Sequence, residues 1–156
     1  MANYITKKGF DRLNKKLQQL IKERPAIIKQ VQTAREMGDL SENAEYHAAR
    51  ENQKHLENEF NKLKRIMQTT KVLDVDKIAK DVVRFGAFVK IFEIAKEEEH
   101  QYQIVGQDET FDYEDGIERI SVTSPIGRAI IGKKVNEEFV VKAPIGDRIF
   151  KILEIK

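Results

Sequence analysis

Two apolar heptad patterns that mirror each other along the sequence constrain the fold of this chain more than any other feature. The first steps by three and four residues from Phe10 to Ala34. The second does so from Ala49 to Thr70. Such spacing places the apolar side chains on one stripe of a helix, as in a coiled coil. Because Phe10 lies as far before Leu40 as Thr70 lies after it, the two stripes predict an antiparallel helical hairpin with its turn at Leu40.

Polar residues interrupt both stripes. Arg24 and Gln53 occupy seam positions, and Pro25 lacks the backbone donor that a continuous helix uses. We therefore expect a kink or a break near Pro25. About 30 residues separate Phe10 from the turn, so each arm is ~45 Å long at 1.5 Å per residue. A hairpin of this length buries little besides its own seam. This indicates that its role is to extend over a long distance.

The helical period fades after Met67, and residues 69–81 predict a linker with a domain boundary after Asp76. Ser124 is a good N-cap and Pro125 a good first helical residue, so we expect a short helix that stops at Gly132. Segments rich in β-branched and aromatic residues predict five strands, which occupy residues 82–95, 101–106, 118–123, 137–143 and 148–155.

The expected fold class is therefore α+β. An antiparallel coiled-coil hairpin occupies residues 1–76 and carries an acidic tip near residues 38–43. An antiparallel β-sheet domain with one short helix occupies residues 77–156.

Charge is divided unevenly between these parts. Residues 1–76 hold 15 Lys and Arg against 11 Asp and Glu, whereas the remainder holds 13 against 15. An anionic partner is therefore expected at the first part. The chain has no cysteine, its three histidines lack zinc-ligand spacing, and no serine has a nucleophile-elbow context. With no signal peptide or membrane-spanning run, we expect a soluble cytoplasmic protein without the machinery of an autonomous hydrolase.

The predicted tip carries two carboxylates, Asp39 and Glu42. One interpretation is structural, because Asp39 as N-cap with Glu42 three residues later approximates a capping box for the second helix. The pattern alone favours this interpretation. The other is functional, because two carboxylates on one turn can hold Mg²⁺, which takes its remaining ligands from elsewhere. In that case the tip is half of a site that a partner completes.

A basic flank lies beside the tip. Arg35 and Arg50 take equivalent positions next to the two seams, on one side of the coil. His47 and Lys54 extend this side as a row with Arg50. An RNA phosphate between the arginines would explain the arrangement, and a solvated helix face explains it equally well.

A family resemblance now emerges. The tip "AREMGDLSENAEYHAARENQ", the segment "ISVTSPIGRAIIGK" and the turn at 144–146 resemble the Gre family of bacterial transcript-cleavage (transcription elongation) factors. The resemblance covers essentially the whole chain, and "NAEYHAAR" points to the GreA branch.

The resemblance implies a coiled coil followed by an FKBP-like domain, and a protein that acts as a monomer on bacterial RNA polymerase. The coil would enter the secondary channel, where Asp39 and Glu42 would help to hold a Mg²⁺ shared with the polymerase. The polymerase would then cleave backtracked RNA, so the factor itself is expected to be neither an enzyme nor the holder of a cofactor alone. Arg35 and Arg50 would face the RNA 3′ segment, and residues 123–125 (Thr123, Ser124, Pro125) would dock on the polymerase.

The sequence departs from the family pattern at Asn136 and Glu137, where the family usually has Gly-Asp. Asn tolerates left-handed backbone, so a turn is still expected there. Two other functions stay open. One is a paralogue that occupies the polymerase channel without promoting cleavage. The other is a prolyl isomerase or chaperone, which the absence of Trp disfavours.

Overall fold

The computed structural model describes residues 3–38, 43–111 and 113–156, and its contacts form two compact units. One unit is the helical hairpin Phe10–Thr69. The other joins the residues up to Gly9 to everything from Thr70 onward. The first residues of the chain thus belong with the C-terminal sheet, a grouping that a single boundary after residue 76 does not describe.

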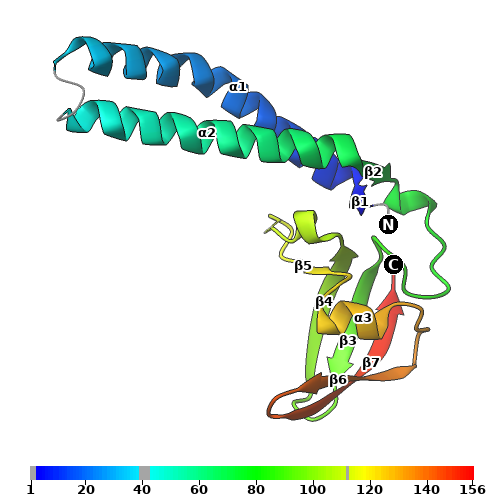
Figure 1. The fold of residues 1–156 in the computed structure, drawn as a ribbon. Helices are drawn as coiled ribbons and strands as arrows, with labels where there is room; N and C mark the ends of the chain where they lie inside the picture. Colours follow the sequence, from blue (N-terminus) through cyan, green and yellow to red (C-terminus); the bar gives the residue numbers. More distant parts are fainter. Residues whose placement is uncertain (1–2, 39–42, 112) are drawn as a thin grey trace. The chain divides into compact units, whose positions relative to one another are not determined.

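The hairpin consists of α1 (Lys7–Glu36) and α2 (Ala44–Thr69), which run antiparallel side by side (Figure 1). The predicted seam is confirmed, since every seam position except Arg24 is buried or half-buried. Its most buried members are Leu13, Val31, Ala34, Leu56 and Leu63, with exposed fractions of 3–7%. No helix among the described residues is both long and apolar enough to cross a membrane.

The polar seam position Arg24 is accommodated by partners on α2. Its Nε lies 2.8 Å from Oε1 of Glu57, and its guanidinium stacks over the ring of Phe60. Of the kink or break expected at Pro25, the break does not occur, because α1 is one helix from Lys7 to Glu36 with Pro25 inside it. Packing on α2 holds the helix on both sides of the proline, through Arg24 before it and the half-buried Ile27 after it. Such tertiary packing outweighs one lost backbone hydrogen bond.

Two short strands were not predicted. β1 (Asn3–Thr6) precedes α1 directly, and β2 (Thr70–Leu73) follows α2 directly. They pair in parallel, from Asn3 opposite Thr70 to Thr6 opposite Leu73. The region expected to be a linker therefore contains a strand, followed by the 3₁₀ turn η1 (Val75–Lys77).

The second unit contains the five predicted strands. They are β3 (Phe88–Glu93), β4 (Glu98–Val105), β5 (Glu118–Ser121), β6 (Glu138–Ala143) and β7 (Gly146–Ile155), in the order β5-β4-β3-β7-β6 (Figure 1). The expectation of an antiparallel sheet needs one correction, because β4 and β5 pair in parallel. Parallel neighbours require a crossover. Residues 106–117, which include the 3₁₀ turn η2 (Gln107–Glu109), provide it.

The helix α3 (Pro125–Ile130) packs on one face of this sheet and completes its core. Alternate residues of the strands face this core; they include Ile91, Ile104, Phe139, Phe150 and Ile152. The predicted helix signals are confirmed, since Ser124 is the N-cap of α3 and Gly132 has a φ of 83°. The predicted turn at Asn136 is confirmed as well, with a φ of 72°.

An arginine fixes the β4–β5 crossover. Arg119, which is 5% exposed, donates from Nε to Gln103 at 2.8 Å and from Nη2 to Asp115 at 2.8 Å. Its guanidinium lies 3.7 Å from the ring centroid of Tyr113. The hydrogen bonds from Arg119 lower the pKa of Asp115 from 3.8 to about 2, and the N–H of Ile117 acts in the same direction.

A lowered carboxyl pKa makes a testable contribution to stability. Because the Asp115 pKa is lower in the folded state, the contribution is full above the unfolded value of 3.8 and disappears as the pH falls through about 2. Asp115→Asn should lower the melting temperature by a few degrees at pH 7. Thermal melts from pH 7 to pH 2 should show this difference narrowing below pH 4. Asp108→Asn, an exposed change on the same crossover, serves as the control. A difference for Asp115→Asn that stays constant down to pH 2 would contradict the assignment.

Candidate functional site at the end of the helical hairpin

The predicted acidic tip lies between the two helices of the hairpin. α1 ends at Glu36 and α2 begins at Ala44. Asp39 and Glu42, like the predicted turn residue Leu40, lie outside the described residues. The site is therefore built from the residues that flank them.

Asn43 closes both helices at this end of the hairpin. Its Oδ1 accepts from the backbone N–H of Tyr46 at 3.1 Å, which makes Asn43 the N-cap of α2. Its Nδ2 donates to the carbonyl oxygen of Ala34 at 2.7 Å and satisfies an acceptor in the last turn of α1. The interpretation that Asp39 caps α2 is thus wrong, because α2 starts five residues after Asp39 and takes its cap from Asn43.

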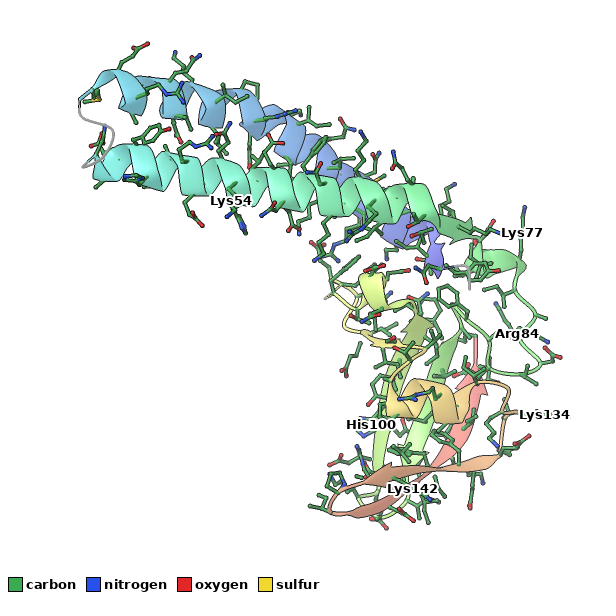
Figure 2. The ribbon with its side chains drawn as sticks, in the orientation of Figure 1. Lys54, Lys77, Arg84, His100, Lys134 and Lys142 are labelled. Carbon is green, nitrogen blue, oxygen red and sulfur yellow. The ribbon has the colours of Figure 1, made fainter. Side chains whose placement is uncertain are left out.

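The basic row of α2 lines a groove along the hairpin. His47, Arg50 and Lys54 are all exposed, and Figure 2 shows the side chain of Lys54 extending outward from α2. The groove has a volume of about 630 Å³, and its walls are Arg24, His47, Arg50, Glu51, Gln53, Lys54 and Glu57. We call it the basic groove, since four of its seven residues are basic side chains. Arg50 is oriented by a 2.8 Å hydrogen bond from its Nη1 to Oε1 of Gln53.

Arg35 does not line the basic groove and packs against Tyr46 instead. The guanidinium of Arg35 lies 5.8 Å from the ring centroid of Tyr46, and the ring of His47 meets that of Tyr46 edge-on. A hydrogen bond from Arg35 lowers the pKa of Tyr46 below 10.0, and the charges of Arg35 and Arg50 add to the effect. Arg35 thus contacts Tyr46 directly, whereas Arg50 acts on it through its charge.

The predicted docking segment separates into two exposed residues and one structural residue. The side chain of Ser124 accepts from the N–H of Gly127 at 3.0 Å and donates to the carbonyl of Ser121 at 2.7 Å. Thr123 and Pro125 are exposed on either side of it. Ser124 therefore shapes the segment, whereas Thr123 and Pro125 present the surface that a partner can touch.

One group of ligand-type side chains occurs among the described residues. Oxygen atoms of Glu93 and Glu98 and a ring nitrogen of His100 lie within 4.8 Å of one another. His100 is labelled on β4 in Figure 2. Arg148 donates to both carboxylate oxygens of Glu93 at 2.9 Å, and this lowers the pKa of Glu93. The group is thus built around an arginine–carboxylate pair, and it belongs to the sheet rather than to the predicted tip.

Three residues of the hairpin site do not follow from heptad spacing: Asn43, Tyr46 and Arg24. Asn43 carried a signal, since Asn directly before a helical run is a typical N-cap. Tyr46 and Arg24 carried none, because their roles depend on contacts with Arg35 and with Glu57 across the structure.

Comparisons with known proteins identify the family of this chain. The N-terminal model of the transcription elongation factors GreA and GreB matches residues 3–72, and the corresponding C-terminal model matches residues 78–156. The transcription elongation factor GreA of Thermodesulfovibrio yellowstonii is 45% identical over 152 residues, which are 97% of this chain and 94% of that protein. GreA of Rhodospirillum rubrum is 44% identical over 153 residues, with 97% and 96% covered.

A solved structure is also similar. The crystal structure of GreA factor homolog 1 of Thermus thermophilus is 24% identical, aligns over 100% of this chain and 99% of that chain, and has a TM-score of 0.46. The sequence matches alone span both units at high identity. This chain belongs to the GreA/GreB family of transcription elongation factors.

Proposed function

We propose that this protein binds bacterial RNA polymerase in the cytoplasm, as a monomer, and stimulates the polymerase to cleave nascent RNA in backtracked complexes. The helical hairpin passes through the secondary channel and delivers its tip to the active centre. The protein is not an enzyme by itself, because the tip supplies only part of a site. Membership of the family and the long hairpin with a two-helix seam support this proposal.

The observation that carries the proposal is the double role of Asn43. This residue caps α2 and satisfies a carbonyl at the end of α1. The start of α2 therefore needs neither Asp39 nor Glu42 as its cap. Two carboxylates in a connection of seven residues, beside an N-cap that Asn43 already supplies, are what a shared cation site would need.

The donor set suits Mg²⁺. This cation prefers oxygen ligands, and proteins commonly bind it through one or two carboxylates while other ligands come from waters and phosphates. Asp39 and Glu42 would hold it, and the polymerase would complete the site. When bound, Mg²⁺ would stabilise the charge that develops as the RNA phosphodiester is hydrolysed. The contribution of this chain is to place two negative charges at the end of a stiff hairpin.

The basic groove would hold the extruded RNA. Arg50 and Lys54 offer charges to phosphates, and Arg35 continues this side through its contact with Tyr46. Phosphate contacts of this kind position RNA without reading its sequence. The groove therefore favours a role that works on any transcript.

Two alternatives make different predictions. A regulator that occupies the channel without promoting cleavage would dock in the same way and leave RNA length unchanged. A prolyl isomerase would need a substrate pocket on the sheet domain. The cavity beside Phe88 and Tyr102 in that domain has a volume of about 110 Å³, below the roughly 300 Å³ at which ligand pockets usually begin. Adding the protein to a stalled, end-labelled elongation complex tests the proposal, and shortened RNA is the expected result.

The tip carboxylates can be tested by one conservative change each. Asp39→Asn should leave polymerase binding unchanged and alter the free energy of unfolding by less than about 0.5 kcal/mol, because Asn43 caps α2. RNA cleavage should fall severely and recover in part at raised Mg²⁺, because an amide is a weaker ligand than a carboxylate and mass action refills the site. Glu42→Gln should behave in the same way.

The matched control is Asn43→Ala, which removes the cap and retains both carboxylates. It should destabilise the hairpin by about 1 kcal/mol, measured by thermal or urea unfolding. If Asp39→Asn cleaves RNA like the parent protein at low Mg²⁺, the metal-binding role of Asp39 is refuted.

The basic groove makes a prediction about salt. Arg50→Ala should reduce cleavage, and the dependence of RNA affinity on salt should weaken by about one phosphate contact. Polymerase docking should stay nearly unchanged. Lys64→Ala, an exposed change on α2 outside the groove, is the control and should have no effect. Crosslinks from the RNA 3′ end that never reach Arg50 would count against this assignment.

The docking segment gives a third test. Thr123→Arg and Pro125→Arg should weaken polymerase binding at little cost in stability, because both positions are exposed. Ser124→Ala should instead lower the free energy of unfolding by about 1 kcal/mol, through loss of the α3 cap. Binding and melting measurements on the same three variants separate the roles. Unchanged affinity in both arginine variants would place the docking surface elsewhere.

A further inference from the structure

A fully buried carboxylate lies in the β4–β5 crossover. Glu109, at the end of η2, has an exposed fraction of 0%. A buried carboxylate is costly unless hydrogen bonds satisfy it. Its oxygens accept from the N–H of Thr6 at 2.8 Å, from the hydroxyl of Thr6, and from the hydroxyl of Tyr113 at 2.9 Å. All three partners donate, as suits an ionised carboxylate, which can only accept.

These partners identify the role of Glu109. Thr6 is the residue before α1, and its Oγ1 accepts from the N–H of Gly9 at 3.0 Å. That is the first half of a capping box, in which the N-cap hydroxyl bonds the N–H three residues later. In the usual second half, a Glu at that third position accepts from the N-cap N–H. Here the third position is Gly9, and Glu109 accepts from Thr6 across 103 residues of sequence.

Gly9 leaves space for the Glu109 side chain. A Cβ at Gly9 would stand 2.7 Å from Oε2 and from Cγ of Glu109, closer than real Cβ atoms approach. The three atoms nearest to that position all belong to the Glu109 side chain. The missing side chain at Gly9 thus provides the space that Glu109 fills. The negative charge also lies at the N-terminus of α1, where the helix dipole favours it.

Neighbouring contacts hold the same two segments together. A Cβ at Gly106 would stand 2.6 Å from the carbonyl oxygen of Tyr4, so the start of η2 approaches β1 closely. The ring of Tyr4 lies 5.8 Å from that of Phe85. Lys8 extends over the ring of Tyr113. Tyr4, Thr6 and Lys8 therefore each approach the crossover, and Glu109 supplies the hydrogen bonds to Thr6.

We propose that Glu109 is a positioning residue: it completes the capping box of α1 from the β4–β5 crossover and so holds the first turn of α1 against that crossover. In the proposed function α1 must be well formed from its first turn onward, and Glu109 contributes by capping that turn. The dependence of cleavage on Glu109 rests on the proposed function. The attachment itself does not.

The decisive experiment separates capping from attachment. Glu109→Ala removes both. The double variant Gly9→Glu with Glu109→Ala moves the carboxylate to the third helical position, where it can cap α1 as in an ordinary capping box but cannot reach between segments. Glu109→Ala removes the three atoms that lie nearest to a Cβ at Gly9 and so makes room for the substitution. Asp108→Asn, an exposed change on the same turn, is the control.

Two readouts report on the protein without polymerase. Amide hydrogen exchange over residues 3–13 reports the capping, and Glu109→Ala should lower protection there by roughly ten- to a hundredfold. Spin labels at Met37→Cys and Ile145→Cys report the attachment. The chain has no other cysteine, and these positions are 68% and 100% exposed. The distance distribution should broaden in Glu109→Ala relative to the parent.

The double variant should recover the exchange protection, keep the broadened distances and cleave RNA as poorly as Glu109→Ala at unchanged polymerase affinity. Recovery of both the narrow distances and the cleavage would show that Glu109 is only a helix cap and would overturn the proposal. Unchanged protection and distances in Glu109→Ala would also overturn it. If the parent protein stimulates no cleavage, the proposed function fails, while exchange and distances still decide the attachment. Glu109→Gln, which retains one acceptor oxygen, should give intermediate values and covers the case in which the alanine variant does not fold.

Discussion

The seam between α1 and α2 is the interaction on which the hairpin depends, because within that unit the two long helices have only each other to pack against. Helices of 30 and 26 residues meet along one stripe, and only five of its side chains are buried to below 10% exposure. Such a narrow core stabilises little per residue, so polar groups beside it matter. Arg24 with Glu57, and Lys16 with Glu59, join the helices along their edges. The result is a rod whose surface stays almost entirely available to partners.

The start of α2 and the start of α1 are each capped by one polar side chain, which makes hydrogen bonds to more than one group. At the tip, Asn43 accepts from α2 and donates to α1. At the root, the carboxylate of Glu109 bonds both the N–H and the hydroxyl of Thr6. In both places one polar side chain satisfies the groups that a helix end leaves unpaired. The start of α2 therefore takes its N-cap from Asn43, next to the connection that carries the proposed tip carboxylates.

Periodicity predicted those parts of the fold whose contacts repeat. The seam, the five strands and α3 with its Ser124 cap all leave local patterns in the sequence. The parts that were missed depend on single contacts between distant residues. β1 pairs with a strand 67 residues later, Gly9 is explained by Glu109, and the turn through residues 106–117 makes β4 and β5 parallel. The helix does not break at Pro25, because the packing that offsets the local cost of the proline comes from α2 and leaves no local signal. Of the candidate site, spacing predicted the shared groove of His47, Arg50 and Lys54, but not the contact between Arg35 and Tyr46.

The pairing of Thr6 with Glu109 also sets an order for folding during synthesis. The seam of the hairpin is complete once Thr69 has left the ribosome, and local contacts of this kind form quickly. β1 must wait for Leu73, and the cap of α1 must wait for Glu109 and the strands that support it. The first turn of the first helix is consequently one of the last parts of the molecule to reach its native contacts. A nascent chain therefore carries a formed hairpin whose first turn stays without its Glu109 cap until the crossover has emerged.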